Sequence, residues 1–63
     1  MRKVLIMLWY TKDGQNYHSS FEKTVLSTDV QWIARQYSEV NENCLCKIFA
    51  DNCKIAESGS HKQ

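Results

Sequence analysis

One segment of this 63-residue chain has a clear helical period, and it limits what the chain can fold into. Between Thr28 and Asn41, apolar residues recur at intervals of three and four, the spacing of one face of an α-helix. The apolar face comprises Val30, Ile33, Ala34, Tyr37 and Val40. A chain this short has room for one thin hydrophobic core, so we expect this helix to pack on a single sheet.

Trp32 lies within the helical segment but not on its apolar face. At about 100° per residue, it points more than a right angle away from the apolar stripe. One interpretation is a stray surface tryptophan, since single exposed apolar residues are common. The other is an anchor for a protein partner, because tryptophan is over-represented among residues that dominate binding energy. A polar rim would surround that anchor, formed by Gln31, Arg35, Gln36, Glu39 and Asn41.

An unbroken apolar run before the helix predicts the first strand, over Lys3–Thr11. Asp13-Gly14 follows it and predicts a type I′ turn, which needs positive φ at both central positions. The turn fixes the register of a hairpin, whose second strand covers Asn16–Leu26. The facing pairs are then Tyr10 and Tyr17, Leu8 and Ser19, Ile6 and Phe21, and Val4 and Lys23.

The segment after the helix predicts a second hairpin. Residues 27–29 can cap the start of the helix. Asn41 and Asn43 suit its end, because asparagine tolerates the left-handed conformation of a C-terminal cap. Cys44–Ala50 and Cys53–Glu57 then read as strands joined by a tight turn at Asp51-Asn52, which places Ile48 opposite Ile55. We expect a single domain over residues 1–57 and a flexible tail over 58–63.

The predicted fold class is therefore α+β, with the order β-β-α-β-β. One helix packs on one face of a four-stranded, mostly antiparallel sheet. The expected core comprises Val4, Ile6, Leu8, Phe21, Val25, Val30, Ile33, Ala34, Tyr37, Ile48 and Ile55. The opposite sheet face then exposes five large apolar residues, Leu5, Met7, Trp9, Leu45 and Phe49.

That outer sheet face has three interpretations. It closes a homodimer, it is a second apolar patch for a protein partner, or it is a base-stacking platform for single-stranded RNA. Lys47 and Lys54 near the aromatics favour the RNA interpretation. The net charge of +1 disfavours it, because phosphate binding needs an excess of positive charge.

The residues argue against an enzyme and against a metal site. His18 and His61 lie far apart, and no base with a third orienting group accompanies a nucleophile. Cys44, Cys46 and Cys53 lack the ligand spacing and the fourth ligand of a structural zinc site. An odd cysteine count in a short chain is typical of reduced thiols in the cytosol. We therefore expect no catalytic residue, no metal and no cofactor.

Hydropathy predicts a soluble, cytoplasmic protein. Hydrophobic residues make up 43% and charged residues 24% of the chain, which is ordinary for a globular domain. No run approaches the ~18 apolar residues of a membrane span. The apolar run after Lys3 is too short for a secretory signal.

Two motifs in the helical segment, DVQW and QY-x-EVN, and the later stretch KIFADNCKIAE resemble the Dmd antitoxins of T-even-type bacteriophages. The match is close from Asp29 to Glu57, whereas the N-terminal hairpin keeps only the strand layout. Matching residues in the helix are Asp29, Val30, Gln31, Trp32, Gln36, Tyr37, Glu39, Val40 and Asn41. Helix geometry places Val30, Tyr37 and Val40 on the core side and leaves the others mostly outward.

The resemblance implies a function that the residue patterns alone do not reach. Members of that family bind host messenger-RNA endoribonuclease toxins of the RnlA and LsoA kind, and so protect phage transcripts in the host cytoplasm. The implied mechanism is direct inhibition, with the antitoxin blocking the RNA-cleaving site of the toxin. The implied partner-binding residues are Asp29, Gln31, Trp32, Arg35, Gln36, Glu39 and Asn41.

Overall fold

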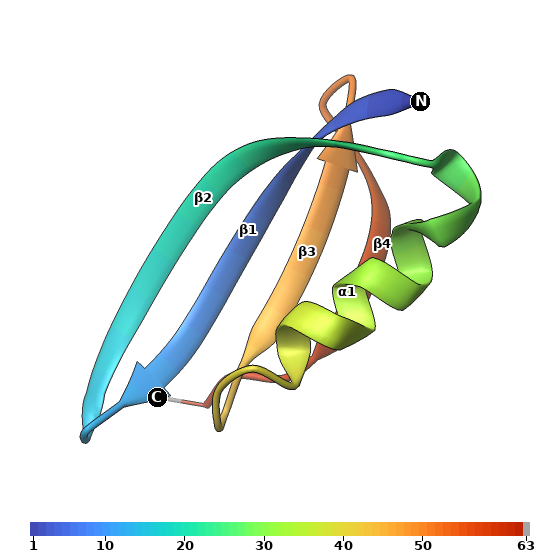
Figure 1. Cartoon of the computed structure of the whole chain (residues 1–63). Helices are drawn as coiled ribbons and strands as arrows, with labels where there is room; N and C mark the ends of the chain where they lie inside the picture. The colour runs from blue at the N-terminus through green and yellow to red at the C-terminus, as the bar shows by residue number, and fades with distance from the viewer. Residues whose placement is uncertain (63) are drawn as a thin grey trace.

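The computed structural model describes residues 1–62 and has the predicted element order (Figure 1). Two strands precede the helix and two follow it, so the α+β prediction is confirmed. The elements are β1 (Arg2–Lys12), β2 (Gln15–Val25), the 3₁₀ turn η1 (Ser27–Asp29), α1 (Val30–Ser38), β3 (Leu45–Ala50) and β4 (Cys53–Gly59).

The four strands form one antiparallel sheet in the order β2-β1-β3-β4. Asp13 and Gly14 hold φ angles of 53° and 79°, as a type I′ turn requires. The predicted register of the first hairpin is confirmed along its length, with Tyr10 opposite Tyr17 and Val4 opposite Lys23. The turn sequence alone therefore determines which side chains of β1 and β2 share a face.

The register of the second hairpin differs from the prediction. Phe49 faces Lys54 as expected, but a register shift follows, and Ala56 rather than Ile55 lies opposite Ile48. A bulge puts one extra residue in β4, so Ala56 takes the buried position. The predicted pair of Ile48 and Ile55 is wrong for this reason. Cys53, at the start of β4, is exposed.

The two edges of the sheet differ. β4 forms one edge, which the register shift makes irregular. β2 forms the other, and within residues 1–62 it pairs only with β1. β2 runs for 11 residues in unbroken register, and the chain contains no proline. Figure 1 shows β2 at the rim of the sheet, away from α1. β2 therefore offers a long, regular row of unpaired backbone groups.

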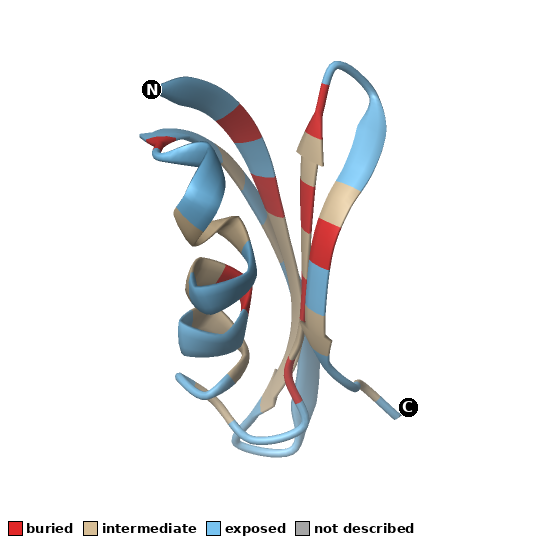
Figure 2. Ribbon diagram, turned by 90° about the vertical axis from the view of Figure 1, so that its right-hand side faces the viewer, coloured by how far each residue is buried: buried red, intermediate tan, exposed pale blue. Residues whose placement is uncertain are grey.

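The core lies between α1 and one face of the sheet, where the red segments of Figure 2 gather. Every predicted core residue is either buried or packed against the buried cluster. Cys46, Ala50 and Ala56 also belong to that cluster, although their small side chains gave no strong hydrophobic signal. α1 packs over β3 and β4 (Figure 1), so the helix covers this half of the sheet more closely than the half formed by β1 and β2.

The helix is shorter than its apolar period suggested. It ends at Ser38, and Glu39 and Val40 close the last turn through main-chain bonds to Gln36 and Tyr37. Val40 was expected on the core side, but it lies beyond the helix and is 68% exposed. The predicted side-chain caps are also absent, since residues 27–29 form the 3₁₀ turn and Asp29 makes no capping bond with its side chain.

The C-terminal segment differs from the predicted flexible tail. β4 continues two residues past the expected boundary, to Gly59. Residues 60–62 then bond to the loop before β3, through Ser60 to Cys44 and through His61 and Lys62 to Asn43. All of these contacts are polar. A hydropathy pattern indicates apolar contacts only, so it does not predict that residues 60–62 bond to this loop. Gln63 lies outside the described residues.

Candidate interaction surface

The outward side of α1 carries a mixed aromatic and polar surface. Trp32 is 63% exposed, and Gln36 follows it one turn later on the same side. Arg35 donates to Glu39 at 3.2 Å, and both side chains are well exposed, so this pair adds little stability. We call Trp32, Arg35, Gln36 and Glu39 the helix face. The structure places all four predicted residues of the helix face together.

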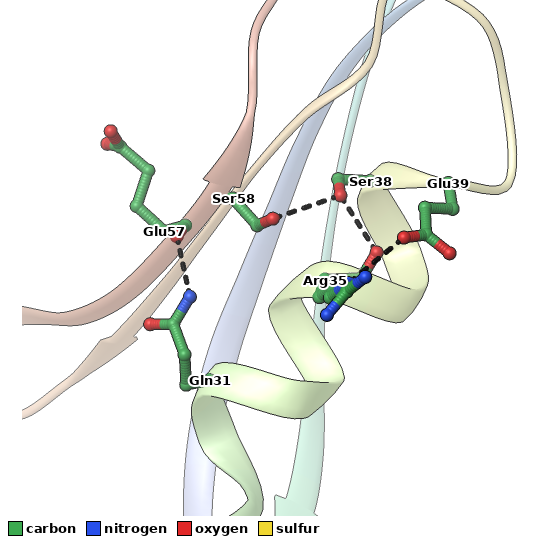
Figure 3. Close-up of polar contacts among 6 residues, drawn as sticks. All are labelled: Gln31, Arg35, Ser38, Glu39, Glu57 and Ser58. Carbon is green, nitrogen blue, oxygen red and sulfur yellow. Dashed lines mark hydrogen bonds and ion pairs between the residues drawn. The ribbon is translucent and has the colours of Figure 1, made fainter.

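The side of α1 that faces β4 is occupied by contacts within the chain (Figure 3). Gln31 donates through Nε2 to the main-chain carbonyl of Glu57 at 3.0 Å. The Ser38 hydroxyl donates to the Arg35 carbonyl at 2.8 Å and accepts from the Ser58 hydroxyl at 3.2 Å, which links the helix to β4. Gln31 was predicted as a partner contact, but its amide is used to attach the helix to β4.

The two remaining predicted residues lie at the ends of the helix. Asp29 precedes α1 and Asn41 follows it in the loop before β3, and both are half-buried. Two exposed apolar side chains flank the helix as well, Leu26 at 51% and Val40 at 68% exposure. Neither residue is expected on this surface from the sequence pattern. If the helix is taken to end at Ser38, before Asn41 and Asn43, Val40 falls outside the helix and is no longer expected on its apolar face.

The outer sheet face brings its five predicted residues together, because Leu5 pairs with Phe49 and Trp9 with Leu45. It is less exposed than predicted. Leu5 is 38% exposed, and the other four are half-buried. The Trp9 ring is covered by the Lys47 ammonium, 5.4 Å from the ring centroid, and by the His18 ring at 4.7 Å. Its faces are therefore already occupied, which disfavours base stacking there.

Charged residues along the outer sheet face form exposed ion pairs. Lys54 donates to Glu57 at 2.9 Å, and the Lys47 ammonium lies 3.9 Å from the same carboxylate. The hydrogen bond from Lys54, with the nearby charges of both lysines, lowers the pKa of Glu57. Lys3 and Glu22 pair at 3.1 Å across β1 and β2. Opposite charges are thus balanced on this face, without a basic patch.

The cysteines do not form a shared ligand set. Cys44 and Cys46 are buried, and Cys53 is exposed at the start of β4. Burial raises the pKa of Cys44 and raises that of Cys46 to about 11. Among residues 1–62, no three His, Cys, Asp or Glu side chains lie close enough to hold a metal ion. Within the same residues, no helix is long and apolar enough to cross a membrane.

Comparison with known proteins matches this fold over nearly its whole length. The family model of Dmd, the discriminator of mRNA degradation, matches residues 1–61. Antitoxin Dmd of Enterobacteria phage T4 is 40% identical over 55 residues, which cover 87% of this chain and 85% of that protein.

Two crystal structures are also similar. In the complex of Escherichia coli toxin LsoA with T4 phage antitoxin Dmd, the matched chain has 36% identity and a TM-score of 0.76, with 97% of this chain and 100% of that chain covered. Dmd from phage RB69 has 28% identity and a TM-score of 0.65, with coverage of 92% and 90%. The family match spans far more than half of the sequence, and the fold agrees with it. The chain therefore belongs to the Dmd family.

Proposed function

We propose that the protein is a phage antitoxin that binds a host endoribonuclease toxin of the RnlA or LsoA type and blocks its RNA-cleaving site. Acting in the host cytoplasm, it protects phage transcripts. The T4 relative, at 40% identity, is an antitoxin, and a chain with the same fold was crystallised in complex with E. coli toxin LsoA. This combination of identity and full-length structural likeness carries the proposal.

The helix face supplies the anchor for this interaction. Trp32 is the largest exposed side chain of α1, and the rigid helix holds it at small entropic cost. Arg35, Gln36 and Glu39 surround it with donors and acceptors that fix orientation. The mechanism is steric, because a bound antitoxin excludes RNA from the toxin cleft and needs no reacting group of its own.

A cleavage assay tests the proposal directly. Purified LsoA is incubated with a messenger-RNA substrate, with and without the protein. We expect cleavage to stop near one antitoxin per toxin, and the tagged protein to capture the toxin. The same assay is run with a toxin of the RnlA type. Full cleavage by both toxins at a tenfold excess of folded protein would refute toxin inhibition.

Salt dependence separates this function from RNA protection by direct binding. Affinity for the toxin should vary little with salt, since the helix face is centred on an apolar side chain. An RNA-binding protein loses affinity steeply as salt rises. Self-association through the outer sheet face stays a prediction, which sedimentation at several concentrations tests.

A further inference from the structure

Asn43, in the loop of residues 39–44 between α1 and β3, makes an unusual set of contacts. Its Oδ1 accepts the Lys62 N–H at 2.7 Å, and its Nδ2 donates to the Lys62 carbonyl at 2.6 Å. One side chain thus pairs with both main-chain groups of Lys62, as a neighbouring strand would. Nδ2 also donates to the Thr11 hydroxyl at 3.0 Å, which links the loop to the end of β1.

Further bonds connect the same loop to the C-terminal segment. His61 donates through Nδ1 to the Asn43 carbonyl at 2.7 Å, and the Ser60 N–H donates to the Cys44 carbonyl at 3.1 Å. We call Ser60, His61 and Lys62, together with Asn43, the C-terminal clasp. The bonds of the clasp hold the side chain and the carbonyl of Asn43 and the carbonyl of Cys44, at the end of the loop.

Gly59 allows the chain to approach the loop this closely. A Cβ atom there would lie 2.1 Å from the Cys44 carbonyl oxygen and 2.8 Å from the Ser38 Cβ. Its φ of +83° is also one that glycine adopts without strain. The chain can therefore pass directly from β4 into the clasp only with glycine at this position.

The clasp contributes nothing to the buried apolar cluster, so its contacts serve the loop rather than the core. The loop carries Asn41, which lies beyond the end of α1 and was predicted to contact the partner. Asn43 itself has a φ of 52°, so the loop conformation depends on a left-handed residue that the clasp holds in place.

We propose that the C-terminal clasp is a positioning element for toxin binding. It fixes the loop 39–44, which carries Asn41 two residues after Glu39 of the helix face, and it acts through Asn41 rather than by direct contact with the toxin. This inference rests on the proposed function, and it assigns Asn43 and residues 60–62 a role in affinity that core packing does not require.

Asn43→Gly tests the proposal, because glycine keeps the positive φ and removes only the side-chain amide. Asn52→Gly is the matched control, since Asn52 has a φ of 64° and is exposed in the β3–β4 turn at the opposite end of the sheet (Figure 1). Asn43→Gly removes the three side-chain hydrogen bonds of Asn43. We expect it to weaken binding to LsoA about tenfold, because the freed loop must be ordered on binding, and we expect Asn52→Gly to leave the affinity unchanged.

Combined variants identify the route of the effect. Ending the chain after Ser60 should weaken binding as much as Asn43→Gly, and the two changes together should cost no more than either alone. In an Asn41→Ala background, Asn43→Gly should lower stability further but not affinity. Multiplicative losses of affinity in that background would show that the clasp does not act through Asn41 and would overturn the proposal.

Two further measurements keep the inference separate from folding and from the proposed function. Amide exchange of residues 39–44 should accelerate in Asn43→Gly, and unchanged exchange would contradict a positioning role. If Asn43→Gly does not fold, Asn43→Asp takes its place, since aspartate keeps an Oδ acceptor for the Lys62 N–H and sets a carboxylate oxygen against the Lys62 carbonyl where Nδ2 donated. If Trp32→Ala weakens toxin binding while the clasp variants bind normally, only the clasp inference fails. If neither LsoA nor a toxin of the RnlA type binds the parent protein, the proposed function fails.

Discussion

The side-chain amide of Gln31 donates to the main-chain carbonyl of Glu57 at 3.0 Å, and so joins the helix to the outer edge of the sheet (Figure 3). A carbonyl at the edge of β4 has no neighbouring strand, so a side chain from α1 takes the place of that strand's N–H. Gln31 thus has a structural partner, although the family resemblance assigned it to the toxin interface.

We expect Gln31→Ala to lower the free energy of unfolding by about 1 kcal/mol, the usual contribution of such a bond. Its effect on toxin affinity should be the smaller of the two. Urea unfolding followed by titration with LsoA measures both quantities. Gln36→Ala, on the exposed side of the same helix, is the control and should reverse the order. A Gln31 variant that loses affinity but no stability would contradict this assignment.

Trp32→Ala should weaken toxin binding by about 2 kcal/mol or more, because a central exposed tryptophan is a typical hot spot. Its stability should change by less than about 0.5 kcal/mol, since the side chain lies outside the core. Calorimetric titration and thermal unfolding give the two numbers. Tyr17→Ala removes another exposed aromatic side chain, at 42% exposure on β2, and should leave the affinity unchanged. Equal affinity of the Trp32 variant and the parent would exclude the helix face.

The two glycines predict losses of stability of different size for the same substitution to alanine. Gly59→Ala should cost about 2–4 kcal/mol, because the new methyl group meets the Cys44 carbonyl and the backbone is left-handed. Gly14→Ala should cost only about 1 kcal/mol, since φ is also positive but nothing lies within 4 Å of the new atom. Denaturant unfolding of both variants tests the difference, and equal losses would rule out the close approach at Gly59.

Stability should depend on the Lys54–Glu57 pair only above acidic pH. The pKa of Glu57 is lowered from 4.5, so its carboxylate stabilises the fold at neutral pH, and this contribution is lost as pH falls through the lowered pKa. Lys54→Gln should therefore destabilise the protein at pH 7 and match the parent at strongly acidic pH. Lys12→Gln, at the end of β1, is the control and should change stability little at either pH. A difference that persists unchanged at low pH would mean that the contact acts through packing alone.

The three cysteines should differ in reactivity. Thiolates are the reactive form, and burial raises the pKa of Cys46 to about 11 and also raises that of Cys44. Cys53 is exposed, so it should react with Ellman's reagent rapidly in the native protein, while the two buried thiols react only on unfolding. Cys53→Ser should abolish the fast phase. A fast phase that survives this substitution would show that the β3 end opens readily.

The sequence predicts the first hairpin and the helix face well, because both follow from local rules. Asp13-Gly14 determines a register of many residue pairs, and the 3.6-residue period places Trp32 outward. The prediction from the sequence fails at Ile55. One extra residue in β4 gives Ile48 the partner Ala56 instead, and a bulge has no local sequence signature comparable to that of a glycine turn.

Contacts between distant polar residues account for the other failures. The pairing of Asn43 with Lys62 spans 19 positions and involves no apolar side chain, so neither composition nor periodicity detects it. Similarly, the apolar period runs through Val40 although the helix stops at Ser38, since hydrophobicity alone does not mark where main-chain bonds end. Both failures lie next to the candidate site, in the segment that the clasp holds.

The unequal edges of the sheet limit how copies of this chain can assemble. A growing fibril needs two open edges per molecule, one for the preceding copy and one for the next. Here β2 is long and regular, whereas β4 is bulged and its Glu57 carbonyl is already engaged by Gln31. We therefore expect backbone pairing with another copy to be favoured at β2 over β4. This difference between the two edges disfavours the open-ended, edge-to-edge stacking that a fibril requires.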